Sequence, residues 1–509
     1  MSSAFRLVPP GCVPPLDPGF RPAALADRGL REEIRASGAG VPLVIALERA
    51  DGAISRYETI AFPDGHPRAG ANLLYAERLV KFLLWARGGW KLVVGGPPHV
   101  GAHVQAVFAP GGARAFDVEF MGGRVYQRPF VVSRCAAHDV PEARETGEAL
   151  GRHLEGCRIG FDLGASDLKI SAVIDGEAVF SDEIVWHPAA QSDPAYHRQM
   201  IVSALRLAQA KMPRLDAIGG SSAGVYVHNQ PMVATLFRGV PAERFGEIRT
   251  MFLRIGEEFG VPLEVINDGD VTALAGAMSL DATGVLGIAM GSSEAAGYVN
   301  LDGAIAGWLN ELAFAPIDYS PSAALDELSG DRGVGAQYFS QQCVFRLAPS
   351  VGITVPAGAG VSMAEQLRHV QAQLEAGHEG AVRIWETIGV YLGYALAHYA
   401  DFYDLTHVLI LGRVTSGRGG PLILERAKAV LAAEFPDLAG VDIRLPDEKI
   451  RRVGQSIAAA SLPALRGERG GVHGAPPLEG ERSGASGEER AERSELGGVQ
   501  GTPPLEEGR

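Results

Sequence analysis

The stretch RIGFDLGASDLKISAVIDGEAVFSDEI, residues 158–184, decides the fold of this chain. Apolar runs at Arg158–Asp162, Leu168–Ile174 and Ala178–Ile184 are separated by a turn of small residues and by the hairpin-favouring dipeptide Asp175-Gly176. The pattern predicts a meander of antiparallel strands that opens a domain.

Helices and strands alternate after this meander. Strands are predicted at Leu215–Gly219 and Leu263–Ile266, and helices near Tyr196–Lys211 and Ala242–Phe259. Alternation of this kind is typical of an α/β fold.

A second meander then repeats the first, with strands predicted at Val285–Met290, Ala296–Asn300 and Ala304–Trp308 and a turn at Asp302-Gly303. The remaining predicted elements are a helix at Gly380–Phe402, a strand at His407–Leu411, a helix at Leu422–Phe435, a strand at Val441–Leu445 and a helix at Gln455–Leu465. Repeated meanders imply two related lobes, one at residues 156–267 with 454–466 and one at residues 268–453. A cleft between such lobes is a common place for a ligand.

The residues before this core predict a separate small α+β domain at residues 1–155. Its signals are strand-like runs at Val41–Leu47 and Trp90–Val94, an amphipathic helix at Ala71–Ala86, and turn dipeptides at Asp51-Gly52 and Gly122-Gly123. Its histidines are scattered and form no catalytic constellation, so the sequence assigns this domain no role.

The last residues, 467–509, are rich in Gly, Pro, Ser, Glu and Arg and have almost no aromatic or β-branched residues. A segment of this composition cannot bury enough apolar surface to offset the entropy of ordering it. We therefore expect a disordered tail.

Composition and charge limit the function classes. A net charge of -14 argues against a general affinity for nucleic acid, because phosphate backbones are held by clustered Lys and Arg. The cysteines, Cys12, Cys135, Cys157 and Cys343, lie in no CxxC spacing that would suggest a disulfide framework or a zinc knuckle. The first residues lack a signal-peptide pattern, and no apolar run reaches the about 18 residues of a membrane span. We expect a soluble, cytoplasmic protein without a membrane or nucleic-acid partner.

Two hairpin turns could hold phosphate groups through backbone N–H groups, because small residues let a phosphate approach closely. The first turn is Asp162-Leu163-Gly164-Ala165-Ser166, followed by Lys169, and the second is Gly291-Ser292-Ser293. Singly, each turn fits an ordinary hairpin better. At equivalent places in repeated lobes, together they favour a phosphate clamp.

A third candidate lies between these turns, where Asn267 and Asp268 end a strand and precede a helix. A carboxylate at such a position can accept a hydroxyl proton, while the amide beside it positions the substrate. Asp268 could equally cap the helix.

These motifs resemble the ROK family of sugar kinases, within the actin, hexokinase and Hsp70 superfamily, over residues Cys157 to Leu465. Asp162 to Ser166 is similar to the family's first phosphate motif, and Asn267-Asp268 matches the pair whose Asp is the general base. Glu311 lies in a segment that resembles the one whose Glu binds sugar hydroxyls. Leu409 to Ser416 resembles the strand and turn that receive the nucleotide, and residues 455–459 fit the closing helix.

The resemblance implies a two-lobed, ribonuclease H-like fold and an ATP-dependent transfer of phosphate to a sugar hydroxyl, with Asp268 as base. Asp162 is implied to orient Mg²⁺, through water. The other residues implied to bind ATP are Gly164, Ala165, Ser166, Lys169, Gly291, Ser292, Ser293 and Gly412. Those implied to bind the acceptor are Ser222, Gly224, Asn267, Asp268 and Glu311.

The sequence also departs from the family pattern. Glu294 brings a carboxylate to the second phosphate loop, where it could repel ATP or help to hold Mg²⁺, and Arg413 replaces a glycine in the nucleotide turn. The Cys-rich zinc motif is missing after Glu311, so zinc is not expected.

Two other functions remain open. A sensor or scaffold of the same fold could bind a sugar or nucleotide without catalysis. A serine hydrolase is suggested by Gly220-Ser221-Ser222-Ala223-Gly224, with Ser222 as nucleophile, but Val225 to Pro231 does not suit the helix that must follow a nucleophile elbow. A DNA-binding repressor is disfavoured because no basic recognition helix is predicted near the amino terminus. A homo-oligomer is a family expectation, and the sequence specifies neither the sugar, its reacting hydroxyl nor the phosphoryl donor.

Overall fold

The predicted first meander is present in the computed structural model, which describes residues 5–145, 150–356, 358, 360–446 and 454–465. Strands β5 (Cys157–Leu163), β6 (Asp167–Ile174) and β7 (Glu177–Val185) pair antiparallel, and β8 (Ala217–Ser222) and β11 (Leu263–Asn267) extend the sheet in parallel. The resulting order, β11-β8-β5-β6-β7, is that of the ribonuclease H-like sheet. The predicted fold class is confirmed.

Helices cover this sheet through apolar side chains. Asp193 caps α5 (Pro194–Gln209) by accepting a hydrogen bond from Ala195 N, as Asp does well at this position. The helix predicted near Ala242–Phe259 is divided into α6 (Phe245–Arg249) and α7 (Met251–Phe259). The division falls at Thr250, whose hydroxyl donates back to Gly246 O at 3.2 Å, a bond that bends helices.

The short closing helix α13 (Gln455–Ala460) packs directly on the backbone of β5 and β8. Gly160 and Gly219 are partners in the register of these strands. A Cβ at Gly160 would lie 1.8 Å from Ser456 O, and one at Gly219 would lie 1.6 Å from Ala459 O. The contact therefore requires glycine at both positions.

The second sheet has the order β13-β12-β14-β15. Strands β12 (Val285–Met290) and β13 (Glu294–Val299) form an antiparallel hairpin, and β14 (His407–Leu411) and β15 (Asp442–Arg444) add in parallel.

The third strand predicted for this meander, Ala304–Trp308, is wrong. Ile305 makes only an isolated bridge to Leu150. The backbone has positive φ at Gly303 (80°), Gly307 (66°) and Asn310 (51°), so the chain turns repeatedly where a strand would run straight.

Helices α8 (Asp268–Leu280), α11 (Glu379–Tyr399) and α12 (Gly419–Glu434) complete the second lobe, together with α9 (Gln341–Leu347) and α10 (Met363–Glu375). Gly389 and Gly393 let α12 approach α11 closely, since a Cβ at Gly393 would lie 2.5 Å from Val430 Cβ. Among the helices of the described residues, none has the length and apolar character needed to cross a bilayer.

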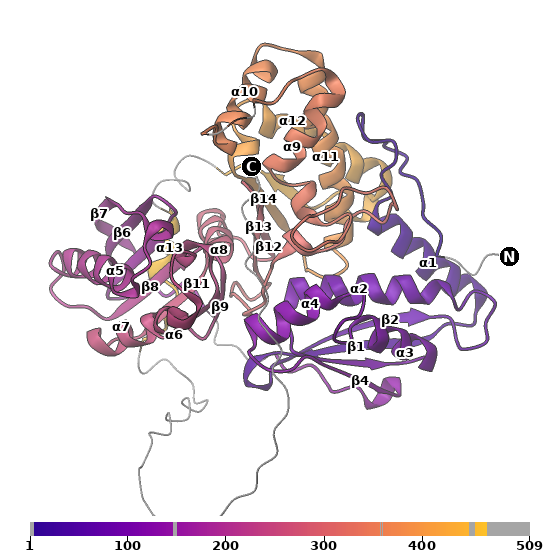
Figure 1. Ribbon diagram of the computed structural model, residues 1–509, viewed down its shortest axis with the longest axis horizontal. Coiled ribbons are helices and arrows are strands. Elements are labelled where there is room, and N and C mark those ends of the chain that lie inside the picture. Colours follow the sequence, from indigo (N-terminus) through magenta and orange to yellow (C-terminus); the bar gives the residue numbers. More distant parts are fainter. Residues whose placement is uncertain (1–4, 146–149, 357, 359, 447–453, 466–509) are drawn as a thin grey trace, which may run out of the picture. The chain divides into compact units, whose positions relative to one another are not determined.

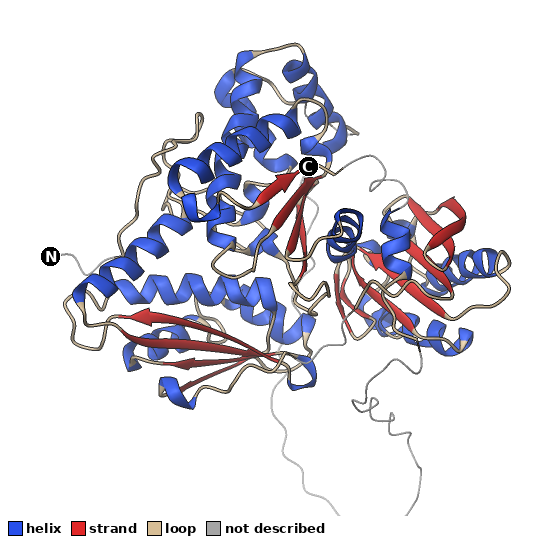
Figure 2. Cartoon of the chain, turned by 180° about the vertical axis from the view of Figure 1, so that it is seen from behind, coloured by secondary structure: helices blue, strands red, loops and turns tan. Residues whose placement is uncertain are grey.

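The amino-terminal residues form a mixed sheet of order β2-β1-β3-β4. The predicted elements appear as β1 (Val41–Glu48), α2 (Ala71–Arg87) and β3 (Lys91–Gly95), accompanied by α1 (Ala23–Ser37), β2 (Ile54–Ala61), α3 (Pro98–Val107) and β4 (Val131–Cys135). Helix α2 lies along one face of the sheet (Figures 1 and 2). The hairpin predicted at Asp51-Gly52 joins β1 to β2.

The hairpin predicted at Gly122-Gly123 is wrong, because both residues lie in a π-helical turn, Phe120–Val125, that continues α4 (Ala115–Glu119). Gly122 packs against the following chain, where a Cβ would lie 2.9 Å from Arg128 O. The glycine pair thus serves a close backbone approach instead of a two-residue turn.

The amino-terminal segment and the second lobe share one hydrophobic core. Phe20 lies 4.8 Å from Tyr391 between ring centroids, and Phe82 lies 4.0 Å from Phe402. The described residues belong to a single compact unit, Met1–Glu468. The boundary at residue 155 therefore stays a prediction, and the tail expected at 467–509 lies outside the described residues.

We expect Gly219→Ala to lower the free energy of unfolding by about 1–3 kcal/mol, because the new methyl group must displace α13. Urea denaturation midpoints would measure the change. Gly246→Ala is the matched control, since no atom lies within 4 Å of its Cβ position and alanine favours a helix. Equal midpoints for both variants would contradict the contact with α13.

Candidate active site

Parallel pairing places the predicted residues of the first lobe at one edge of its sheet. Asp162 at the end of β5 is the register partner of Ser221 in β8. Ser222 is in turn the partner of Asn267 at the end of β11. Ends of adjacent parallel strands gather side chains in this way, and such edges are where ligands bind in α/β proteins.

Asp162 is buried, and only one of its two carboxylate oxygens accepts the hydrogen bond from Ser221. Ser221 Oγ donates to its Oδ1 at 2.7 Å, and Lys169 Nζ lies 3.9 Å from its Oδ2. Burial raises the pKa of Asp162, while the Ser221 hydrogen bond and the Lys169 charge oppose that rise. Ser221 was missed by the sequence analysis, where it stood only as a neighbour of Ser222.

The first hairpin tip is held from one side by Trp186. Trp186 Nε1 donates to Gly164 O at 2.8 Å, and Trp186 N donates to Ser166 O at 3.1 Å. Ala165 and Ser166 are exposed. The tip is thus a fixed, small-residue turn next to Asp162.

The second hairpin tip joins β12 to β13 and is also exposed, at Ser292 and Ser293. Gly291 N donates to Ser293 O at 3.0 Å, and Gln341 N at the start of α9 donates to Gly291 O at 2.9 Å. Gly412 lies beside this tip, because a Cβ there would be 2.6 Å from Met290 N. Among the described residues, no hydrogen bond or ion pair recorded joins the first tip to the second.

Asn267 and Asp268 stand where the chain passes from the first sheet to the second. The cap of α8 is Asn267, whose Oδ1 accepts from Gly269 N at 2.7 Å and whose Nδ2 donates to Gly224 O at 2.8 Å. Asp268 Oδ1 accepts a longer bond from the same amide, at 3.0 Å. Capping is therefore chiefly the role of Asn267, and the partly buried Asp268 retains a second oxygen.

The amino-terminal end of α8 is pressed onto β13. A Cβ at Gly269 would lie 2.3 Å from Ala296 O, and a Cβ at Gly297 would lie 2.2 Å from Gly269 O. Glycine at both positions therefore fixes Asp268 against the second sheet.

The chain just before Glu311 is held near α8 by hydrogen bonds of Asn310, to which the sequence analysis assigned no role. Asn310 Nδ2 donates to Asp270 Oδ1 at 2.8 Å, and Tyr403 Oη donates to Asn310 Oδ1 at 3.1 Å. Asn310 is buried with a φ of 51°, a conformation that Asn tolerates better than most residues. Its place directly before Glu311 was the available signal.

Burial and mutual repulsion raise the pKa values of the acidic side chains around Asp268. Burial, and then the charge of Asp162, raise the pKa of Asp268 to about 6. Burial, and then Asp268 and Asp270, raise the pKa of Glu311 to about 7. Burial also raises the pKa of Asp270 to about 7. Asp162, Asp268 and Glu311 therefore lie within one electrostatic neighbourhood, and Asp268 is poised to exchange a proton near neutral pH.

Glu294 does not face a phosphate site, contrary to both roles considered for it. The side chain is 4% exposed, and a Cβ at Gly335 would lie 2.0 Å from its Oε2. Burial raises the pKa of Glu294 to about 8. The group is thus an inward-facing, protonated acid at neutral pH and places no negative charge on the exposed tip.

Ser222 lacks the setting of a hydrolase nucleophile. The strand that carries it is followed by a hairpin, β9 (Val225–Val227) and β10 (Gln230–Val233), and not by a helix. The hydrogen bond recorded for Ser222 Oγ among the described residues comes from Tyr226 Oη, at 2.6 Å.

The residues present fit a magnesium ion held through water. No group of three or more His, Cys, Asp or Glu residues able to hold a metal occurs in the described part of the chain. Asp162 offers the Oδ2 that Ser221 leaves free. Mg²⁺ commonly keeps several waters and one or two carboxylates beside substrate phosphates, so a single carboxylate is compatible with its binding.

We expect Asp268→Asn to raise the free energy of unfolding at pH 8 by about 1–3 kcal/mol, because each pKa unit corresponds to about 1.4 kcal/mol. Because the pKa is raised to about 6, Asp268 keeps its proton in the folded chain at pH values between about 4 and 6, where the unfolded chain has already released it. Wild-type stability therefore falls as the pH rises through that window. The gain should shrink at pH 5.

Asp281→Asn is the matched control, because Asp281 ends the same helix and its side chain is 98% exposed. Denaturant titrations at both pH values would measure the differences. A loss of stability in Asp268→Asn that is equal at pH 5 and pH 8 would contradict the electrostatic account.

No protein-family model matches the chain, and no curated protein matches its sequence. Similar solved structures include a ROK hexokinase from Thermus thermophilus, with 17% identity, a TM-score of 0.47, and coverage of 60% of this chain and 97% of that one. A ROK-family glucokinase from Streptomyces griseus, in complex with glucose and AMPPNP, has 18% identity, a TM-score of 0.43, and coverage of 60% and 98%.

A ROK-family transcriptional regulator, a homologue of the E. coli MLC protein, has 19% identity, a TM-score of 0.47, and coverage of 61% and 78%. These similar structures are thus ROK-family sugar kinases and a ROK-family regulator, the family whose motifs the sequence resembles.

Proposed function

We propose that this chain transfers the γ-phosphoryl group of ATP to a hydroxyl of a sugar or sugar-like acceptor, with Asp268 as the general base. One observation carries the proposal. Asp268 is a partly buried carboxylate at a strand end; burial and then Asp162 raise its pKa to about 6, and its own charge in turn raises the pKa of Glu311. A base with a pKa near the working pH is the most effective kind.

The proposed reaction is a direct displacement. The acceptor hydroxyl loses its proton to Asp268, its oxygen bonds to the γ-phosphorus, and the bond from that phosphorus to the bridging oxygen of ADP breaks. Glu311 accepts hydrogen bonds from other acceptor hydroxyls. Asn267, whose amide bonds to Gly224 and Gly269, keeps Asp268 in position and has a second Nδ2 hydrogen with which to orient the ring.

Phosphate binding is proposed for the exposed hairpin tips, residues 164–166 and 291–293, with Lys169 and Gly412. Bound Mg²⁺ would offset the charge of the transferred group, and Asp162 would accept hydrogen bonds from its water ligands. Lys169, 3.9 Å from Asp162, adds a positive charge beside the first tip.

We expect Asp268→Asn to lower kcat by about 10²–10⁴-fold, the usual contribution of a positioned base. In the wild-type enzyme, kcat/KM for the acceptor should rise with pH as Asp268 loses its proton, with a midpoint near 6. A coupled assay of ADP release, over a panel of hexoses with Mg-ATP, would measure both, with Asp281→Asn as control. Wild-type turnover in Asp268→Asn would exclude Asp268 as the base.

Binding without turnover is the competing outcome. Thermal shifts with a sugar and with Mg-ATP, but no ADP release from any acceptor, would identify a sensor of the same fold. The exposed Arg413 after Gly412 is the departure that would then need explanation.

We expect Glu311→Gln to lower kcat/KM for the acceptor by about 10–100-fold, since hydrogen bonds to charged groups contribute about 1.5–3 kcal/mol. The KM for ATP should change little, because Glu311 is assigned to the acceptor. Steady-state kinetics with each substrate varied in turn would separate the effects, and an equal change in both would contradict this assignment.

A further inference from the structure

The backbone of Glu311 is hydrogen-bonded to the end of a helix in the amino-terminal segment. Asn310 N donates to Ala86 O and Glu311 N donates to Trp85 O, each at 2.9 Å. These carbonyls belong to the last turn of α2, which ends at Arg87. The last carbonyls of a helix have no partner within the helix, so residues 310 and 311 complete its hydrogen bonding.

Trp85 strengthens this attachment through its side chain. The ring is fully buried and lies 4.3 Å from the ring of Phe314, three residues after Glu311. Trp85 Nε1 donates to Asp117 Oδ1 at 2.6 Å. One residue therefore holds Glu311 through its carbonyl, contacts the chain after it through its ring, and is itself fixed through its indole N–H.

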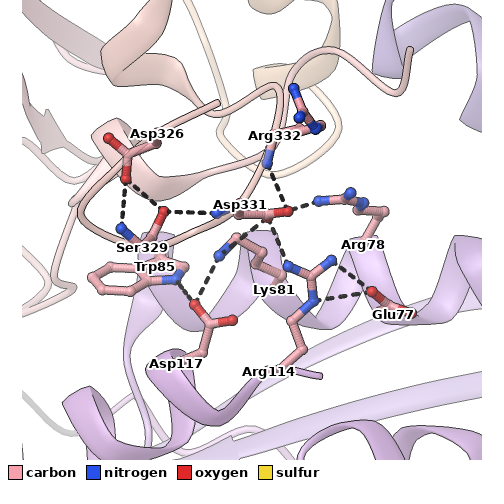
Figure 3. A network of polar contacts seen from close by, with 10 residues as sticks. All are labelled: Glu77, Arg78, Lys81, Trp85, Arg114, Asp117, Asp326, Ser329, Asp331 and Arg332. Carbon is pink, nitrogen blue, oxygen red and sulfur yellow. Dashed lines mark hydrogen bonds and ion pairs between the residues drawn. The ribbon is translucent and has the colours of Figure 1, made fainter. Parts of the chain in front are cut away.

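A buried ion cluster ties the far end of the same loop to the same helix (Figure 3). Asp331 accepts from Arg78 at 2.8 Å and lies 2.7 Å from Arg114 and 3.4 Å from Lys81. Lys81 also donates to Asp117 at 2.8 Å. Burial alone would raise the pKa of Asp331, but the charges of Arg78, Lys81 and Arg114 hold it below its ordinary value.

Both ends of residues 310–331 are thus fastened to α2 by groups that solvent barely reaches. The side chains of Lys81 and Asp117 are 1% and 2% exposed, and those of Asp331 and Arg114 are both 9% exposed. Breaking a buried pair leaves an uncompensated charge, which is strongly destabilising. The segment therefore has little freedom to move away from α2.

We infer that the amino-terminal segment is a working part of the acceptor site, in which α2 positions Glu311 through the Trp85 carbonyl and through the Lys81–Asp117–Asp331 cluster. Trp85 and Lys81 are positioning residues and do not contact the substrate. This inference rests on the proposed function in one respect, that the acceptor is the ligand of Glu311. The attachment of residues 310–331 to α2 is given by the hydrogen bonds and ion pairs described above and does not depend on the proposed function.

The test compares Lys81→Met with Lys91→Met. Lys81→Met keeps the aliphatic stem, the Trp85–Asp117 bond and the two arginines on Asp331, but it leaves the buried Asp117 carboxylate without its ion pair, so a loss of stability is expected. If this variant does not fold, the second variant carries the test. Lys91 is the control because its ion pair with Glu48, at 2.9 Å, is half-exposed and lies within the amino-terminal sheet. Trp85→Phe is a second variant, which retains a ring against Phe314 but loses the indole N–H and part of the buried ring volume.

Two readouts are expected to change in Lys81→Met and not in Lys91→Met. Hydrogen exchange at the amides of Asn310 and Glu311, followed by mass spectrometry of peptides spanning 309–315, should become at least about 10-fold faster as the local opening free energy falls. The acceptor kcat/KM should fall about 10-fold or more, since small displacements of a positioning group are costly. The KM for ATP should stay within about twofold, and Trp85→Phe should move both readouts in the same direction by less.

Unchanged exchange at residues 310 and 311 would overturn the inference, as would faster exchange with unchanged acceptor constants, or an equal loss in the acceptor and ATP constants. If the wild-type chain phosphorylates no acceptor, the proposed function fails by itself. The exchange experiment, with thermal shifts by added hexoses in place of turnover, then still decides whether α2 positions Glu311.

Discussion

The site depends on the parallel register of β5, β8 and β11. This register makes Asp162 a partner of Ser221, and Ser222 a partner of Asn267, so residues separated by more than a hundred positions in the chain meet at one sheet edge. A shift of one residue would turn each of these side chains to the opposite face. The glycines that admit α13 against the sheet hold the register, because the helix fits only where Gly160 and Gly219 lie side by side. Close packing in the first lobe thus determines the position of a carboxylate at its edge.

The second constraint is electrostatic and works against stability. Asp268, Asp270 and Glu311 each have a pKa raised first by burial and then by a neighbouring carboxylate. Charged forms of such groups cost free energy in a poorly solvated environment. The chain tolerates the cost where hydrogen bonds compensate, as for Asp270 with Asn310 and the amide of Tyr298. Asp268 accepts from backbone amides, that of Gly269 at 3.0 Å among them, and its pKa of about 6 is the lowest of the three.

The sequence was most informative where structure is local. Apolar runs separated by turn residues predicted β5, β6 and β7, and a turn dipeptide predicted the β1–β2 hairpin, because both depend on neighbours in the chain. Asp268 could be selected because a strand end is recognisable from sequence. The expected strand at Ala304–Trp308 failed because Gly303 and Gly307 serve turns that carry the chain to α2, a tertiary contact without local signal. The inward orientation of Glu294, and the roles of Ser221 and Asn310, likewise depend on partners far away in the sequence, such as Gly335, Asp162 and Asp270.

The same long-range contacts change what the amino-terminal residues are. Interfaces between movable domains are usually more polar and of modest size, whereas here Phe20 and Phe82 pack into the aromatic core of α11 and the residues after it. Buried charges reinforce the contact, since Lys81 and Asp117 satisfy each other beneath the loop that carries Asp331. The amino-terminal segment and the second lobe share a core, the hydrogen bonds at the end of α2 and a cluster of buried charges. Separating them would expose apolar side chains, helix-end carbonyls and buried charges to solvent. We therefore infer that the amino-terminal sheet packs as part of the second lobe, with helix α2 supporting Glu311.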